Sequence, residues 1–268
     1  WRSRGFSEYG IEDFIMTDGT HGVRYSISQI DKGEGLNIPA FIPRKPGEMG
    51  LAPSQPTTDK PVMEEMFGPT RAATCFPSGA CMACSWDTSL FADLGKALAE
   101  ECREMGVGLL LGPGINIRRT PLAGRGYEYY SEDPVLTGDL AASLIASLQA
   151  NGVGACLKHF ACNNSEYQRM SMDSVVDVRA LREIYLAGFQ RAVTRARPWT
   201  VMSSYNLLNG VHTAQDPWLL TTVLRNEWGY DGLVISDWYG VKDRPASLLA
   251  GNDLSMPERP KEKERLLD

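Results

Sequence analysis

The feature that most constrains the fold is a repeated unit in which a short apolar segment runs directly into polar residues. Five clear segments each predict a strand: FIMTDG ending near Asp18, VGLLLGPGIN near Asn116, VGACLKHF at His159, WTVMSSYN at Tyr205 and GLVISDW at Asp237. NDLSMP is a weaker sixth candidate. The polar residues at the strand ends are therefore the first place to look for function.

Helical patterns separate these segments. Between Thr88 and Met105 apolar residues recur every three or four positions, which predicts a helix with one buried stripe of Leu90, Phe91, Leu94, Leu98, Cys102 and Met105, ended by Gly106. Three more helices are predicted: Pro134 to Asn151-Gly152, Val178 to Arg195 with Leu181, Ile184, Tyr185 and Phe189 facing inward, and Pro217 to Trp228.

Strands that alternate with helices indicate βα units and a mainly parallel sheet. A (β/α)8 barrel takes about 250 residues and builds its active site at the carboxyl ends of its strands. An open doubly wound sheet would also gather polar residues there, but no G-x-G-x-x-G follows the first strand. The predicted fold class is therefore α/β, a (β/α)8 TIM-like barrel over residues 1–256, incomplete at its start because only six strands are visible.

Two segments break the rhythm of strands and helices. Residues 26–80 are rich in Pro and Gly and carry little periodicity, which predicts a loop insertion over the active-site face or against another domain. Residues 257–268 carry a dense charge run, PERPKEKERLLD, which predicts a solvated tail or a linker towards a domain outside this chain.

Composition excludes several classes of protein. A net charge of −6 argues against a nucleic-acid partner, which needs clustered Lys and Arg. No segment approaches the roughly 20 apolar residues of a membrane span, so no membrane partner is expected. Cys81 and Cys84 form a C-x-x-C without a second pair or a nearby His, so neither a metal nor a cofactor is predicted. The six sparse cysteines favour a reducing, cytoplasmic compartment over secretion, although the localisation stays unknown.

Carboxylates and cations dominate the strand ends. Such a mixture suits a sugar, because charged groups hold vicinal hydroxyls by strong hydrogen bonds. It also suits a carboxylate nucleophile that neighbouring cations keep ionised. Taken singly, Glu128 is expected to pair locally with an arginine, and His159 could be a satisfied core histidine. Trp238, directly after Asp237, offers an aromatic face of the kind that stacks on sugar rings, although a tryptophan there can equally belong to the core.

Ordered motifs run from residue 17 to residue 256, apart from the insertion: TDGTHGVR, GPGINIRRTPLAGRGYEYYSEDP, GVGACLKHFACNNSEYQRM, VMSSYNLLNG and DGLVISDW, followed by LLAGNDLSMP. Through them the sequence resembles glycoside hydrolase family 3. The resemblance implies that Asp237, the aspartate of SDW, is the nucleophile of a retaining β-glycosidase. It also implies a set of substrate-binding residues: Asp18, Arg24, Arg125, Lys158, His159, Arg169, Tyr205 and Trp238.

Two differences narrow the substrate that the resemblance implies. Family branches that act on N-acetylhexosamines carry a PGHG-type loop after KHF, whereas this chain has ACNNSEYQRM. Xylosidase-like members often place Glu at the position of Asp18, which the resemblance assigns to the hydroxyls at C4 and C6. The resemblance therefore favours a β-glucosidase that releases terminal β-D-glucose from a β-glucoside or oligosaccharide, with a β-xylosidase as the alternative.

Retaining hydrolysis needs two carboxyl groups about 5 Å apart, and Asp237 supplies only one. The resemblance implies an acid/base Glu on an α/β sandwich domain, on the same gene product or another chain, and therefore outside these residues. Glu128 and Glu166 lie near the motifs but match positions with other roles. A rival from another class is a non-catalytic sugar-binding barrel, which the absence of an acid leaves open.

Overall fold

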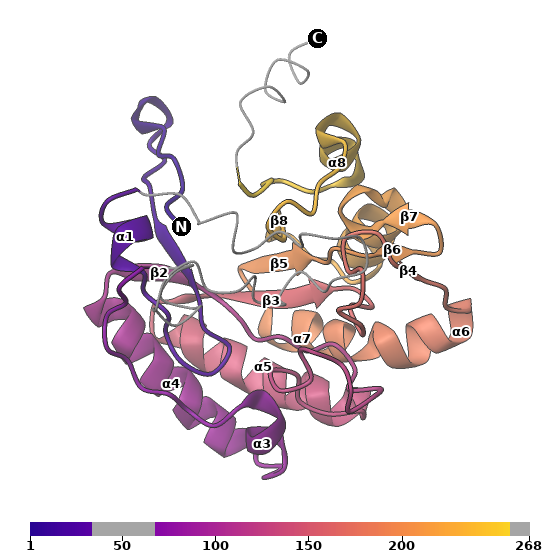
Figure 1. Cartoon of the computed structure of the whole chain (residues 1–268), viewed down its shortest axis with the longest axis horizontal. Helices are drawn as coiled ribbons and strands as arrows, with labels where there is room; N and C mark the ends of the chain where they lie inside the picture. Colours follow the sequence, from indigo (N-terminus) through magenta and orange to yellow (C-terminus); the bar gives the residue numbers. More distant parts are fainter. Residues whose placement is uncertain (34–67, 258–268) are drawn as a thin grey trace, which may run out of the picture.

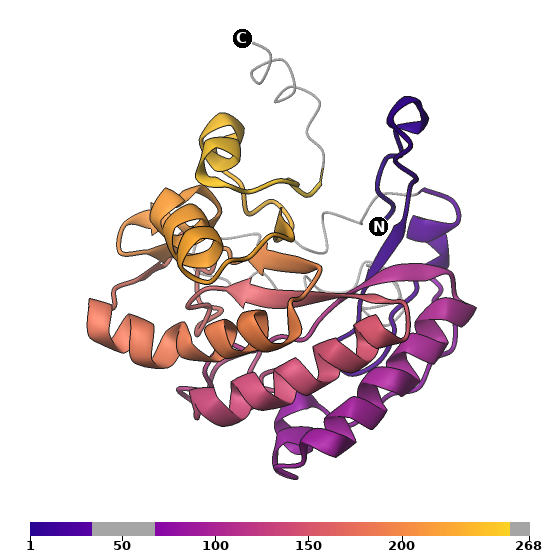
Figure 2. The same ribbon diagram turned by 180° about the vertical axis from the view of Figure 1, so that it is seen from behind.

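The computed structural model describes residues 1–33 and 68–257, and its centre is a curled sheet of five parallel strands (Figures 1 and 2). The strand order is β1, β2, β3, β5 and β8, with neighbours parallel throughout. Their bounds are β1 Ile15–Asp18, β2 Val107–Leu111, β3 Gly154–Phe160, β5 Thr200–Ser203 and β8 Leu233–Ser236. The α/β class and the five clear strands are confirmed, and the sheet forms part of a barrel.

Three long helices lie side by side under the outer face of this sheet (Figures 1 and 2). They are α4 Thr88–Glu104, α5 Pro134–Ala150 and α7 Ala187–Ala196. Asp87 and Asp133 begin α4 and α5, because each carboxylate accepts two backbone N–H groups that the first turn leaves unpaired. Pro134 occupies the first turn of α5, and Asn151 follows its last residue, as predicted.

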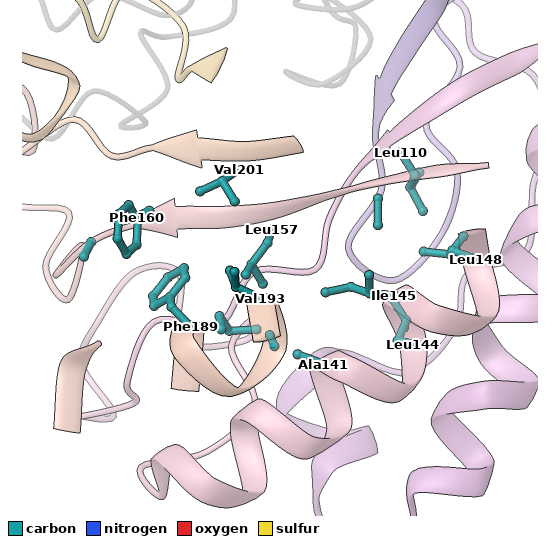
Figure 3. Packing of buried hydrophobic residues seen from close by; sticks show 14 of the residues in the cluster. Leu110, Ala141, Leu144, Ile145, Leu148, Leu157, Phe160, Phe189, Val193 and Val201 are labelled. Carbon is teal, nitrogen blue, oxygen red and sulfur yellow. The ribbon is translucent and has the colours of Figure 1, made fainter. Parts of the chain in front are cut away.

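The strands are buried on both faces. One set of alternate residues packs against the helices, and it includes Leu110, Ala155, Leu157, Val201 and Val234. Figure 3 shows Leu110, Leu157 and Val201 from the strands above Leu144, Ile145 and Leu148 of α5. The other set fills the inside of the curl and consists of Met16, Leu109, Leu111, Cys156, Met202 and Ile235, with Met256 beside them. This period of two follows from the strand pleat and explains why the strands read as continuous apolar runs.

Glycines allow the outer helices to approach closely. A Cβ added to Gly95 of α4 would lie 2.8 Å from the carbonyl oxygen of Leu144, and one added to Gly138 of α5 would lie 2.9 Å from that of Gly188. Side chains at these positions would push the helices apart. The helix layer is therefore packed tightly enough to fix the sheet above it.

The core of this layer should be sensitive to truncation. Leu148 of α5 is fully buried, so Leu148→Ala is expected to lower the free energy of unfolding by about 2 to 5 kcal/mol. Leu249→Ala is the matched control, because Leu249 is 85% exposed and should change stability by less than about 0.5 kcal/mol. Urea unfolding followed by circular dichroism measures both. Equal effects would contradict this description of the core.

The remaining elements are short. Before β2 they are a 3-10 turn at Ser7–Tyr9, α1 Ile27–Ile30 and α3 Gly79–Ala83. After β3 come β4 Asp173–Ser174, α6 Val178–Ala180 and a π-helical turn at Leu181–Tyr185. After β5 come β6 Leu207–Leu208, β7 Val211–His212, a 3-10 turn at Thr213–Gln215 and a π-helix at Trp218–Glu227, with α8 Arg244–Ala250 after β8. Strands β4, β6 and β7 form a small separate sheet.

Two side chains predicted to face the core do not. Leu90 is 38% exposed, because it lies in the first turn of α4 beside its capping residue Asp87. Ile184 is 41% exposed, because Leu181–Tyr185 is a π-helical turn in which the N–H of Leu186 bonds the carbonyl of Leu181. The wider turn shifts Ile184 off the 3.6-residue stripe. The predicted helix from Val178 to Arg195 is thus three consecutive segments.

The sixth predicted strand, NDLSMP, is wrong as a strand. Among the described residues only Leu254 pairs there, in a single parallel bridge with Ile235. The side chain of Asp253 accepts the N–H of Val234 at 2.7 Å, which occupies the donor that a continuing ladder would need. Asp253 also binds Arg225 at 2.7 Å, and backbone bonds between this segment and residues Val234 and Ser236 hold it beside β8 without forming a strand.

The predicted insertion, 26–80, is only partly a loop. Its described ends contain α1 and the start of α3, and Thr70 bridges to Ser26. Residues 34–67 and the predicted tail after Pro257 lie outside the described residues. Residues 70–75 border a pocket that also contains Asp18, which agrees with an insertion beside the active-site face.

Candidate active site

The carboxyl ends of the strands bring the predicted residues together. Asp18 ends β1, Lys158 and His159 lie near the end of β3, and Asp237 follows β8. Parallel neighbours end at one edge of a sheet, so residues far apart in sequence meet there. Lys158 Nζ lies 2.6 Å from Asp18 Oδ1, and His159 Nε2 lies 3.7 Å from Asp237 Oδ2. The peptide bonds Lys158–His159 and Phe160–Ala161 are both cis.

Asp18 lies between two cations. Its carboxylate pairs with Lys158 and with Arg24, whose guanidinium is 2.5 Å away. Burial would raise the pKa of Asp18, but the charges of Lys158 and Arg24 outweigh it and hold that pKa well below its usual range. Lys158 is almost fully buried, and burial alone would lower its pKa, yet Asp18 holds it above the ordinary value. Asp18 and Lys158 are therefore both charged near neutral pH.

Arg125 connects three other site residues. Its Nε donates to Glu128 at 2.5 Å, its Nη2 lies 2.7 Å from His159 Nε2, and its Nη1 lies 4.0 Å from Asp237 Oδ2. Burial opposes the charge of Arg125, but Glu128 above all outweighs this and raises the pKa of the guanidinium. A planar fork of fixed donors suits such multiple pairing better than a lysine would.

His159 is neutral in this surrounding. Burial, followed by the charges of Arg125 and Lys158, lowers the pKa of the imidazole well below its ordinary value. Its backbone is held by Asn116, whose side chain accepts the N–H of His159 at 3.0 Å and donates to its carbonyl at 2.9 Å. The ring therefore has a fixed place between Arg125 and Tyr129.

Arg169 and Tyr205 are two further site residues that contact each other. Arg169 donates to Glu166 at 2.9 Å, and its guanidinium carbon lies 4.6 Å from the centre of the Tyr205 ring. Burial first, and then the charge of Asp237, raise the pKa of Tyr205 well above its ordinary value. The phenol therefore keeps its proton and places a neutral hydroxyl near Asp237.

The two carboxylate oxygens of Asp237 differ in their hydrogen bonding. Oδ1 accepts the N–H of Trp238 at 2.7 Å. Oδ2 is buried and accepts no hydrogen bond from His159 or Arg125, which lie 3.7 and 4.0 Å away, while the side chain of Tyr205 is in hydrogen-bonding contact with the Asp237 carboxylate. A buried carboxylate oxygen without a partner is costly, and such atoms mark functional sites more often than they mark a stable core. This oxygen therefore needs an explanation beyond the packing of the fold.

Trp238, for which the sequence left a sugar-stacking face and a place in the core as alternatives, is covered on one face in the structure. Its ring stacks on Trp1, with centroids 4.7 Å apart and planes 24° apart. Trp1 and Trp238 both pack against the residues inside the curl. One face of the indole is therefore covered, and the structure leaves its role in binding sugar as a prediction.

Several buried polar residues that contact the predicted site residues were not themselves predicted from the sequence. Asn116, Tyr129 and Asn163 are at most 2% exposed and hydrogen-bond to His159, to Glu166 or to each other. The sequence marks Asn116 as the polar end of an apolar segment, as it does Asp18 and Asp237, but the family resemblance does not include it among the site residues. Tyr129 and Asn163 carry no such signal, because a tyrosine and an asparagine beside a motif are ordinary loop residues.

A pocket of about 580 Å³ opens beside this cluster. Asp18, Arg24, Arg125 and Glu128 line one side of it, and residues 70–75 line the other. Within residues 1–33 and 68–257, no three His, Cys, Asp or Glu side chains gather as metal ligands. In the same residues no helix has the length and apolar character of a membrane span.

Comparison with known proteins identifies the family of the chain. The model of the glycosyl hydrolase family 3 N terminal domain matches residues 63–264. Thermostable beta-glucosidase B of Acetivibrio thermocellus is 48% identical over 257 residues, which cover 96% of this chain and 30% of that protein. An exo-alpha-(1->6)-L-arabinopyranosidase of Bifidobacterium longum is 45% identical over the same shares. The chain thus spans about a third of its relatives' length.

Solved structures give the same answer for the fold. The Bifidobacterium adolescentis GH3 beta-glucosidase superposes with a TM-score of 0.81 at 42% identity, covering 100% of this chain and 33% of that one. Beta-glucosidase 3B of Thermotoga neapolitana in complex with glucose gives 0.79 at 41% identity, covering 99% and 33%. Sequence motifs, curled sheet and site geometry agree with these matches, and the chain belongs to glycosyl hydrolase family 3.

Proposed function

We propose that this chain forms the nucleophile-bearing part of a retaining β-glycosidase that releases terminal β-D-glucose. The observation that carries the proposal is the buried Oδ2 of Asp237, which accepts no hydrogen bond from a neighbouring cation and has the Arg125 guanidinium 4.0 Å away. An ionised carboxylate of this kind can attack an anomeric carbon and form a covalent glycosyl intermediate, which water then hydrolyses with net retention. Asp237 is the only proposed catalytic residue of the chain.

The surrounding residues are proposed to hold the sugar. Asp18 with Arg24 and Lys158 forms a charged clamp for hydroxyls, and Arg125, His159 and Arg169 offer further polar contacts. Charge-assisted hydrogen bonds of this type are about twice as strong as neutral ones. Tyr205 lies beside the nucleophile, and Trp238 is proposed to contribute the face that Trp1 leaves uncovered.

The acid/base is proposed to come from an α/β sandwich domain outside this chain. Glu128 and Glu166 are poor candidates, because each is held in an ion pair with an arginine, at 2.5 and 2.9 Å, and is not free to deliver a proton. In the full protein the curled sheet is proposed to make up most of the (β/α)8-like barrel over residues 1–256. Residues 257–268 are the proposed connection to further chain.

The substrate preference should depend on Asp18. We expect the full-length protein to cleave 4-nitrophenyl β-glucoside with a kcat/KM roughly ten- to a hundredfold above that for β-xyloside or α-L-arabinopyranoside, because these pentosides lack the C6 hydroxyl that Asp18 would bind. Asp18→Asn should reduce this ratio towards one.

The matched control for this test is Asp13→Asn, since Asp13 makes an exposed ion pair with Arg2 away from the site. A wild-type preference for either pentoside would show that Asp18 does not select a hexose. The arabinopyranosidase relative makes that outcome the second candidate function. Binding of glucose without turnover of any of the three glycosides would instead favour a sugar-binding barrel.

A further inference from the structure

Buried side chains connect two arginine–carboxylate pairs of the site through His159. The pairs are Arg125 with Glu128 and Arg169 with Glu166. On one side, Arg125 is bonded to Glu128 and approaches His159 Nε2 at 2.7 Å. On the other side, the hydroxyl of Tyr129 lies 3.2 Å from His159 Nδ1. The chain of contacts therefore passes through both nitrogens of one imidazole.

The same contacts continue through Asn163. Its amide group donates to the hydroxyl of Tyr129 at 3.2 Å and to Glu166 at 3.1 Å, and Glu166 in turn holds Arg169. Tyr129 and Asn163 are both 1% exposed. A carboxylate only accepts hydrogen bonds, so Asn163 must turn its amide nitrogen towards Glu166. The same nitrogen therefore also faces the hydroxyl of Tyr129, which accepts from it.

The donors in this chain dictate where the proton of His159 lies. An arginine carries only N–H donors, so Nε2 of His159 must accept from Arg125. A neutral imidazole with an accepting Nε2 carries its proton on Nδ1, which points at the hydroxyl of Tyr129. Burial and neighbouring cations lower the pKa of His159 well below its ordinary value, which is consistent with a single proton on the ring.

We infer that Tyr129 and Asn163 are positioning residues that hold His159 as its neutral Nδ1–H tautomer and thereby keep its Nε2 from donating to Oδ2 of Asp237. His159 Nε2 is 3.7 Å from that oxygen. In the opposite tautomer Nε2 would carry a hydrogen, lose its bond from Arg125 and present a donor to Asp237. A hydrogen-bonded carboxylate oxygen is a weaker nucleophile. The consequence for catalysis rests on the proposed function, whereas the tautomer itself does not.

The kinetic test uses two neighbouring tyrosines in the full-length protein. Tyr129→Phe removes the hydroxyl that faces His159, and we expect kcat/KM for 4-nitrophenyl β-glucoside to fall roughly tenfold, with a lower kcat. Tyr130→Phe is the matched control, because the Tyr130 hydroxyl is buried and makes no hydrogen bond. It should leave both constants unchanged. Equal losses in the two variants would overturn the inference.

The decisive readout is the protonation of the ring itself. In protein labelled with 15N-histidine, the His159 signals are identified by subtracting the spectrum of His159→Gln. We expect a protonated Nδ1 and a bare Nε2 in the wild type and in Tyr130→Phe, with the opposite tautomer gaining population in Tyr129→Phe.

A wild-type ring protonated on Nε2, or on both nitrogens, would overturn the inference even if Tyr129→Phe failed to fold. An unchanged tautomer in folded Tyr129→Phe would overturn it as well. The expected tautomer pattern in a protein that cleaves no glycoside would leave the positioning of His159 standing and remove the proposed function instead.

Discussion

Replacing Asp237 with alanine is expected to lower kcat for aryl β-glucosides by roughly three orders of magnitude or more, because the attacking group itself is lost. The fold should survive the change. Asp237 lies beyond the last residue of β8, where its side chain accepts the N–H of the next residue, Trp238, and contacts the side chain of Tyr205. Removing its buried Oδ2 also relieves a cost in the folded state.

The control for this variant is Asp231→Ala, at the opposite end of the same strand. Asp231 pairs with Arg197 at the surface, where both side chains are more than half exposed, so its loss should change neither turnover nor stability by much. Steady-state kinetics and a thermal melt of both variants are the measurements. Near-normal turnover by Asp237→Ala would remove Asp237 from the mechanism.

The second large effect concerns the proton that the leaving group needs. The 268-residue chain produced alone is expected to hydrolyse 4-nitrophenyl β-glucoside about 10² to 10⁴ times more slowly than the full-length protein, the usual contribution of general acid catalysis. A 2,4-dinitrophenyl leaving group needs little protonation, so its rate should fall much less. The dependence on leaving group separates a missing acid from a misfolded chain.

The comparison needs a check that the isolated chain is folded, for which circular dichroism and binding of glucose serve. Two variants supply internal controls: Glu128→Gln and Glu166→Gln. Each should weaken sugar binding through the arginine it holds, but neither should abolish the dependence on leaving group. Full turnover of 4-nitrophenyl β-glucoside by the isolated chain would place the acid among these 268 residues.

The strands and the polar residues at their ends could be predicted from the sequence because each apolar run is followed directly by a polar residue. An apolar run followed by a polar residue marks a buried parallel strand, and the barrel principle then places the polar residue at the site. Asp18, Lys158 and Asp237 were found in this way, and the structure brings them to one edge. The same signal failed at NDLSMP, where Asp253 binds the backbone of β8 by its side chain.

Other features depend on contacts that no local pattern reveals. The π-helical turn that exposes Ile184 breaks the helical period without a proline or glycine at that point. The stacking of Trp1 on Trp238 joins the two ends of the described chain. Tyr129 contacts His159 and Asn163 contacts Tyr129, each through a single hydrogen bond, and the sequence positions of both residues resemble ordinary loop positions.

The most direct test of the account is covalent trapping with a 2-deoxy-2-fluoro-β-glucoside that carries a good leaving group. The fluorine slows both steps by destabilising their oxocarbenium-like transition states, and the good leaving group restores the rate of the first step alone, so the glycosyl intermediate should accumulate on the full-length protein. Mass spectrometry of its peptides is expected to find one fluorosugar on the segment Ile235–Trp238, attached to Asp237. A fluorosugar attached to any other carboxylate, such as Glu128 or Glu166, would contradict the assignment of Asp237 as the nucleophile.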